Sequence, residues 1–184
     1  VDSSLNIKGS ISSGIKKIAK ENNIKIMPLI VNASFNQKTM HSILIASSRK
    51  QDELIEFLIS EAIINNYAGW QFDFEHIHYT DRDKYSEFIE RTYKAFKNKN
   101  LVLSIAAVVS TKDTSIDSDM YKNWSGAFDY KRLAESTDFI SLMTYDDPAS
   151  FGPVASMPFI ENVYEYMKDK IPPRKMSLGI PLYY

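Results

Sequence analysis

The stretch Ala68-Gly69-Trp70-Gln71-Phe72-Asp73-Phe74-Glu75-His76 alternates aromatic and polar side chains with a period of two residues. Because successive side chains of a β-strand point to opposite faces, the three aromatic rings share one face, and Gln71, Asp73 and Glu75 share the other. Burying two carboxyl groups on one face of a strand costs several kcal/mol per unpaired charge. Such a cost indicates function, and Glu75 stands at the carboxyl end of the strand, where parallel α/β proteins carry their active sites.

Other apolar runs rich in β-branched residues lie on both sides of this strand. Strands are predicted at 24–31, 69–77, 101–109, 138–145 and 176–183, and amphipathic helices at 48–65, 81–98 and 157–170. The helix from 48 begins with a capping-box pattern, Ser48 followed by Gln51. Apolar strands that alternate with amphipathic helices predict the α/β class with a parallel sheet. The spacing fits either a (β/α)8 barrel, at ~31 residues per unit, or an open flavodoxin-like sheet, which suits the length better.

The composition excludes several classes of protein. Lys and Arg number 22 and Asp and Glu 23, so the formal net charge is -1 and no basic field attracts nucleic acid. The apolar runs are far shorter than the ~20 residues of a membrane span. The absence of cysteine excludes disulfides, thiolate metal sites and cysteine nucleophiles. We therefore predict neither a nucleic-acid partner nor a membrane span.

The paired acids Asp73 and Glu75 predict general-acid chemistry. Their Cα atoms would be about 6.6 Å apart along a strand, so that one charge disfavours the other and one carboxyl keeps its proton near neutral pH. A protonated acid beside an ionised one can cleave a glycosidic bond. The alternative is that the two acids end the strand and point to water.

A second unusual strand, 138–146, directs Ser141, Met143 and Tyr145 to one face and brings Asp146 to its carboxyl end. The Tyr145 hydroxyl could bind a substrate oxygen, or could be a core hydroxyl bonded to a backbone carbonyl. Trp124, in a polar segment, could stack on a sugar ring or pack against its own helix.

Three motifs together resemble a known family. Phe72-Asp73-Phe74-Glu75, Met143-Thr144-Tyr145-Asp146 and Leu178-Gly179-Ile180-Pro181-Leu182-Tyr183 are similar, in order and spacing, to the fourth, sixth and seventh strands of glycoside hydrolase family 18. That family includes chitinases and endo-β-N-acetylglucosaminidases and folds as a (β/α)8 TIM barrel. The segment 152–173 is most similar to bacterial members that act on peptidoglycan or spore cortex. The resemblance implies that residues 1–184 form a partial catalytic barrel covering about strands 3–7, with the eighth-strand tryptophan outside this sequence.

The resemblance also implies roles for individual residues. Glu75 would be the general acid and later the general base, Asp73 would orient the substrate acetamido group, and Tyr145 would donate a hydrogen bond to its carbonyl, which is the nucleophile in this family. The other implied substrate-binding residues are Gln71, Met143, Asp146 and Tyr183. The family signature D-G-x-D-x-D-x-E falls on 68–75, where Ala68 and Gln71 replace two of its acids.

The implied reaction is cleavage of β-1,4-linked glycans that contain N-acetylglucosamine, either chitin-like or peptidoglycan, with retention at the anomeric carbon. The alternative is a chitinase-like lectin that binds such glycans without turnover. Neither a metal nor an organic cofactor is implied. The expected partner is the glycan alone, the expected state is a monomer, and the substrate implies a secreted or cell-envelope protein.

Overall fold

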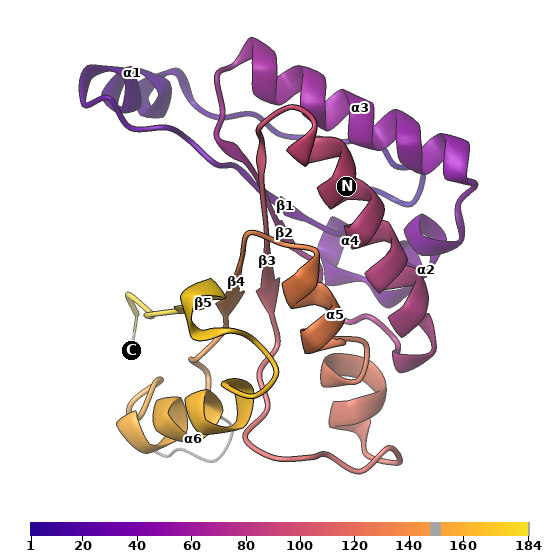
Figure 1. Cartoon of the computed structure of the whole chain (residues 1–184), viewed down its shortest axis with the longest axis vertical. Helices are drawn as coiled ribbons and strands as arrows, with labels where there is room; N and C mark the ends of the chain where they lie inside the picture. Colours follow the sequence, from indigo (N-terminus) through magenta and orange to yellow (C-terminus); the bar gives the residue numbers. More distant parts are fainter. Residues whose placement is uncertain (148–151, 184) are drawn as a thin grey trace.

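The computed structural model describes residues 1–147 and 152–183 and has a parallel sheet of five strands (Figure 1). These are β1 (Leu29–Val31), β2 (Gly69–Asp73), β3 (Val102–Ala107), β4 (Phe139–Leu142) and β5 (Met176–Leu178). Each strand pairs in parallel with the next along the chain, in the order β1-β2-β3-β4-β5. This order is that of a (β/α) barrel, whereas a flavodoxin-like sheet has the order 2-1-3-4-5. The predicted α/β class and partial barrel are confirmed.

All five strands lie where they were predicted, but they are shorter. The strand predicted to reach residue 77 ends at Asp73, and the last strand ends at Leu178 rather than at 183. His76 has a left-handed backbone with φ of 54°, which is incompatible with an extended strand. Glu75 therefore lies just beyond β2, and not inside it.

Six α-helices connect and cover the strands in the described residues: α1 (Ser13–Glu21), α2 (Gln37–Ile45), α3 (Ser48–Ile64), α4 (Arg82–Lys97), α5 (Tyr130–Glu135) and α6 (Met157–Met167). The three predicted helices correspond to α3, α4 and α6, while α1, α2 and α5 were not predicted. Short helical turns η1 (Ala33–Phe35), η2 (Tyr79–Asp81), η3 (Tyr121–Ser125) and η4 (Pro173–Lys175) complete the connections. None of the helices in the described ranges is long and apolar enough to cross a bilayer.

The predicted capping box of α3 is wrong by one residue. Ser47, not Ser48, is the N-cap, and its side chain accepts a hydrogen bond from the backbone N–H of Lys50. The Gln51 side chain is buried and donates to the carbonyl oxygens of Ile43 and Leu44. Gln51 thus satisfies the end of α2 instead of the start of α3, a tertiary contact that a local pattern does not contain.

The two faces of the sheet differ as the alternation predicted. Trp70 donates through Nε1 to the carbonyl of Leu58 in α3 at 2.9 Å, and the ring of Phe72 stacks 6.1 Å from that of Phe88 in α4. The helices therefore cover the aromatic face of the sheet (Figure 1). By the alternation of the strand, the polar side chains of β2 lie on the other face. Gly69, with φ of 152°, lets β2 approach β3 closely, because a Cβ there would lie 1.8 Å from the carbonyl oxygen of Val102.

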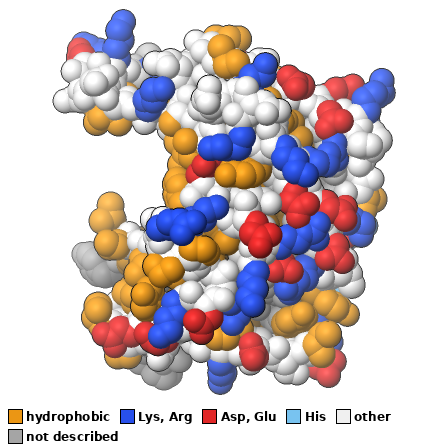
Figure 2. Space-filling model, in the orientation of Figure 1, with side chains coloured by type: hydrophobic (Ala, Val, Ile, Leu, Met, Phe, Trp, Pro, Cys, Tyr) orange, Lys and Arg blue, Asp and Glu red, His pale blue; other side chains and the backbone are white. Residues whose placement is uncertain are grey.

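Charges of both signs are mixed on the helix-covered side of the molecule. Figure 2 shows Lys and Arg side chains interspersed with Asp and Glu over the helices. Several form ion pairs between elements, among them Arg132 with Glu90 and Lys97 with Asp138. No large area of one sign is visible on this face, in keeping with the formal net charge of -1.

Candidate active site

A cavity of about 610 Å³ opens at the carboxyl ends of β2, β3 and β4. Asp73 and Glu75 reach it from the end of β2. The segment after β4 contributes Met143, Tyr145 and Asp146. Five of the seven predicted site residues thus line one cavity, although they come from two strands more than 60 residues apart in the chain.

Gln71 and Tyr183, the other two predicted site residues, do not line this cavity. Gln71 lies deeper on the inner face of the sheet, paired in register with Leu29 of β1 and Ser104 of β3. Tyr183 lies beside the cavity, and its hydroxyl is 2.9 Å from each carboxylate oxygen of Asp146. The implied contacts of Gln71 and Tyr183 with substrate remain predictions.

The environment of the paired acids favours their protonated forms. Burial is the largest cause that raises the pKa of Glu75, followed by the negative charge of Asp73; the charge of Asp146 raises this pKa further and that of His76 opposes it. Burial also raises the pKa of Asp73. The pKa of Glu75 is therefore raised as predicted, but burial contributes more to this shift than the charge of Asp73, which is the predicted cause.

Asp73 has one carboxylate oxygen, Oδ1, that is buried without a hydrogen-bond partner among the described residues, as are the hydroxyls of Tyr85 and Ser104. Unsatisfied buried polar atoms cost about 1–3 kcal/mol each. A group that lacks partners in the free protein is able to accept a hydrogen bond from a ligand. Asp73 therefore has the free acceptor that an amide N–H of a substrate requires.

Tyr145 is positioned by the chain that follows β5. Gly179 lies against its ring: a Cβ at this position would be 2.7 Å from Cε1 of Tyr145. Thr144 donates through Oγ1 to the carbonyl of Gly179 at 2.8 Å, which fixes the two segments together. Burial and then the charges of Asp73, Glu75 and Asp146 raise the pKa of Tyr145, so its hydroxyl stays protonated and can donate a hydrogen bond.

Asn32, at the carboxyl end of β1, holds the backbone of Glu75. Its side chain accepts from the N–H of Glu75 at 3.0 Å and donates to the carbonyl of Glu75 at 3.1 Å. The side chain is fully buried. Sequence reasoning gave Asn32 no role in the site; the available signal was a polar residue directly after a predicted strand.

Each of the two segments that carry the candidate catalytic residues turns sharply just after them. His76 follows Glu75 and Asp146 follows Tyr145, with left-handed φ angles of 54° and 55°. Such backbones cost about 1–3 kcal/mol at residues other than glycine and concentrate at functional sites. His76 is fixed by a 3.0 Å contact from Nδ1 to the carbonyl oxygen of Phe35, and its ring lies 3.9 Å from that of Trp124. Trp124 itself lines the cavity, which leaves it available for stacking.

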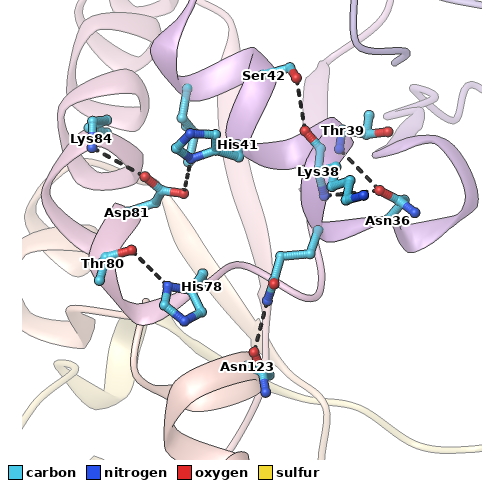
Figure 3. A network of polar contacts seen from close by, with 12 residues as sticks. Asn36, Lys38, Thr39, His41, Ser42, His78, Thr80, Asp81, Lys84 and Asn123 are labelled. Atoms are coloured by element: carbon cyan, nitrogen blue, oxygen red, sulfur yellow. Dashed lines mark hydrogen bonds and ion pairs between the residues drawn. The ribbon is translucent and has the colours of Figure 1, made fainter.

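A group of polar contacts surrounds α2, the turn η2 and the turn η3, which contains the cavity residue Trp124 (Figure 3). His41 of α2 contacts the buried carboxylate of Asp81 at 2.7 Å, and Lys84 contacts its other oxygen at 3.2 Å. Gln37 donates to Asn123, the neighbour of Trp124, at 3.0 Å. The network therefore joins α2 to the start of α4 and to η3. In the described ranges, no three acidic or histidine side chains are grouped so that they could hold a metal ion.

These features define the class of protein. A parallel sheet whose strand order follows the chain, with its cavity at the carboxyl ends of the strands, is part of a (β/α) barrel with a candidate site where barrel enzymes carry theirs. The family model described as Glycosyl hydrolases family 18 matches residues 5–184. The chain belongs to glycoside hydrolase family 18.

Several curated proteins are similar to this chain. The chain is 31% identical over 129 residues to the uncharacterized glycosylase YvbX of Bacillus subtilis, covering 68% of this chain and 36% of that protein. It is 27% identical over 177 residues to the cortical fragment-lytic enzyme of Bacillus subtilis, covering 93% of this chain and 40% of that protein. The chain thus spans about two fifths of the length of these curated relatives.

Solved structures have the same fold. The spore cortex-lytic enzyme SleL of Bacillus megaterium aligns with a TM-score of 0.86 at 27% identity, over 100% of this chain and 42% of that chain. A chitinase from Chromobacterium violaceum aligns with a TM-score of 0.84 at 21% identity, over 100% of this chain and 58% of that chain. The five-stranded unit is therefore a recurring part of larger barrels.

Proposed function

We propose that the protein is a glycoside hydrolase that cleaves β-1,4-linked glycans containing N-acetylglucosamine, with retention at the anomeric carbon. The observation that carries this proposal is the convergence of Glu75, Asp73 and Tyr145 on one cavity. Their environments favour a protonated acid and a protonated phenol there. Residues 1–184 would form part of the catalytic barrel of the full-length protein.

In the first step, the Glu75 carboxyl donates its proton to the glycosidic oxygen as the bond from that oxygen to the anomeric carbon breaks. The carbonyl oxygen of the substrate's own acetamido group bonds to the anomeric carbon and forms an oxazolinium ion, so the protein supplies no nucleophile. Tyr145 donates a hydrogen bond to that carbonyl oxygen. Asp73 accepts the acetamido N–H and stabilises the positive charge.

In the second step, the Glu75 carboxylate takes a proton from a water molecule that attacks the anomeric carbon from the side of the departed sugar. The acetamido carbonyl leaves, and the product has the configuration of the substrate. Because Glu75 returns to its protonated form, the cycle closes without a metal or an organic cofactor. The environment that raises the pKa of Glu75 supports both roles, since the group must hold a proton first and then regain it.

The names of two relatives favour peptidoglycan as the natural glycan. One is called a cortical fragment-lytic enzyme and another a spore cortex-lytic enzyme. A chitin-like polymer shares the same N-acetylglucosamine unit and would fit the same chemistry. A secreted or cell-envelope location follows from the proposed substrate only as a prediction, and the monomeric state also stays a prediction.

A sugar-binding protein without turnover is a second candidate, which the exchange of a signature acid for Gln71 favours. Gln71 lies below Asp73 on the same face of β2 and cannot share a proton with it. Glu75 argues for the enzyme, because a binding protein has no need of a partly buried acid with a raised pKa at this place. Turnover is the property that separates the two candidates.

The stereochemistry of the product tests the proposal. The full-length protein is incubated with a chromogenic glycoside of an N-acetylglucosamine oligomer, and the first product is followed by NMR before it equilibrates. We expect release of the chromophore and initial appearance of the β-anomer. Initial appearance of the α-anomer would contradict substrate-assisted retention, and binding without release would favour the sugar-binding candidate.

A further inference from the structure

The loop between β3 and η3 forms one wall of the cavity. Val108, Ser110, Lys112 and Met120 are among its residues that line the cavity. The other charged groups in the lining of the described chain are the carboxyl groups of Asp73, Glu75 and Asp146. Within residues 1–147 and 152–183, Lys112 is therefore the one basic side chain in a lining that has three acidic side chains.

This loop is fastened on both sides of Lys112. Tyr130 of α5 donates through its hydroxyl to the carbonyl of Val108 at 2.8 Å. Tyr166 of α6 donates through its hydroxyl to the carboxylate of Asp113 at 2.7 Å. The two anchors come from helices outside the loop, so the loop is held on both sides of the exposed Lys112.

Among the described residues, the ammonium group of Lys112 has no polar partner. No ion pair or hydrogen bond of its Nζ is found with any residue that the structure describes, and its sequence neighbour Asp113 is bound by Tyr166 instead. Asp113, the nearest acid along the chain, is thus hydrogen-bonded to α6, while Lys112 lines the cavity. An unpaired lysine beside three carboxyl groups is available for a negative ligand.

A neutral glycan has no group that requires such a cation. A glycan that carries carboxylates would instead be repelled by the carboxylates of Asp73 and Asp146, and the positive charge of Lys112 would offset this repulsion. Peptidoglycan has such a group, because alternate sugars carry a lactyl ether that ends in a carboxylate or is extended by a short peptide. Chitin-like polymers and peptidoglycan therefore differ in negative charge, which is the property that a lysine side chain recognises.

We propose that Lys112 binds a carboxylate of the substrate glycan, on the lactyl ether or on its attached peptide, and so selects acidic peptidoglycan-type glycans over neutral homopolymers of N-acetylglucosamine. This inference rests on the proposed function, since it names the substrate class of the same cavity. It assigns a specificity-determining role to a loop residue that takes no part in proton transfer.

Binding to the full-length protein with the Glu75→Gln substitution tests the proposal without turnover. The ligands are an alternating tetrasaccharide with free lactyl carboxyl groups, the same tetrasaccharide with these groups converted to methylamides, and a third form with the lactyl group extended by alanine. We expect the free acid or the alanine form to bind about three- to tenfold more tightly than the methylamide, as one partly exposed charge pair allows. The acid form that binds more tightly than the methylamide shows whether Lys112 binds the carboxylate of the lactyl ether or that of the attached peptide.

Substitutions at position 112 then test the residue. Lys112→Gln should abolish the preference for the acid form, and Lys112→Arg should retain it. Lys99→Gln, an equal charge change at an exposed lysine remote from the cavity lining, should leave the preference intact. A preference that persists in Lys112→Gln, or the absence of any preference in the parent, would overturn the proposal, and so would failure of all three ligands to bind.

The outcome is separable from that of the proposed function. Turnover is measured on the protein with Glu75 intact, whereas the carboxylate preference is measured on Glu75→Gln. Acid-selective binding without turnover would support Lys112 and contradict the hydrolase. Turnover without acid selectivity would support the hydrolase and contradict the role of Lys112.

Discussion

Asp146 influences the proposed general acid through its charge. Its charge adds to those causes that raise the pKa of Glu75, after burial and the charge of Asp73. The Tyr183 hydroxyl, 2.9 Å from both carboxylate oxygens, holds Asp146 in place. The pH at which the protein loses activity on the alkaline side therefore depends on a residue that is separate from the proton donor.

We expect Asp146→Asn to move the alkaline limb of the kcat/KM profile to lower pH. A neighbouring negative charge disfavours the ionised form of Glu75, so removing it lowers the pKa of Glu75, and the protonated acid is lost at a lower pH. The measurement is the pH–rate profile of hydrolysis. Asp169→Asn, an exposed acid on the chain after α6, serves as the charge-matched control and should leave the limb in place. A limb that stays unmoved or moves to higher pH in Asp146→Asn would refute this coupling.

At the scale of elements, β1 matters to the site through one side chain at its end. Asn32 bonds to both the N–H and the carbonyl of Glu75, so β1 and the end of β2 are fixed to each other beyond the last strand pair, Val31 with Asp73. Four residues later, Asn36 caps α2 by accepting from the backbone N–H groups of Lys38 and Thr39. The two asparagines have the same chemistry, but only one of them touches the catalytic segment.

We expect Asn32→Ala and Asn36→Ala to lower the free energy of unfolding by similar amounts but to differ in activity. Loss of the buried partner of Glu75 costs about 1–3 kcal/mol, and loss of the helix cap costs about 0.5–2 kcal/mol. Asn32→Ala should also lower kcat/KM by at least about tenfold more than Asn36→Ala, because small misplacement of a catalytic group is costly. Denaturant unfolding and steady-state kinetics measure the two effects. Equal activity of the two variants would show that Asn32 is only structural.

The positions of the elements were more predictable than their ends. The five strands and the helices α3, α4 and α6 were predictable because apolar periodicity is a local property. The extension of β2 to residue 77 was not excluded by the sequence, since the left-handed turn at His76 depends on contacts with Phe35 and Trp124. α5 is only six residues long, which is too short for an apolar stripe to be detected.

At the scale of the whole molecule, the strand order of the barrel turns two distant motifs into one site. Asp73 and Glu75 were predictable from the unfavourable placement of acids in a strand, and Tyr145 and Asp146 from a second strand with polar residues at its end. The roles of Asn32 and Lys112 were not predictable. Asn32 acts through its hydrogen bonds to Glu75 and Lys112 through its place in the cavity lining, and both depend on the three-dimensional fold. The resemblance to family 18 implied the roles of these residues, and the strand order explains why the two motifs lie close together.

The central claim is that this cavity carries out hydrolysis through Glu75. Turnover of a chromogenic N-acetylglucosamine oligomer glycoside by the full-length protein with Glu75→Gln tests it most directly, with the exposed Glu56→Gln as the matched control. We predict a rate loss of at least about 100-fold for Glu75→Gln, a change in oligosaccharide Kd of less than about tenfold, and an unchanged rate for Glu56→Gln. Turnover by Glu75→Gln at the rate of the parent protein would contradict the account.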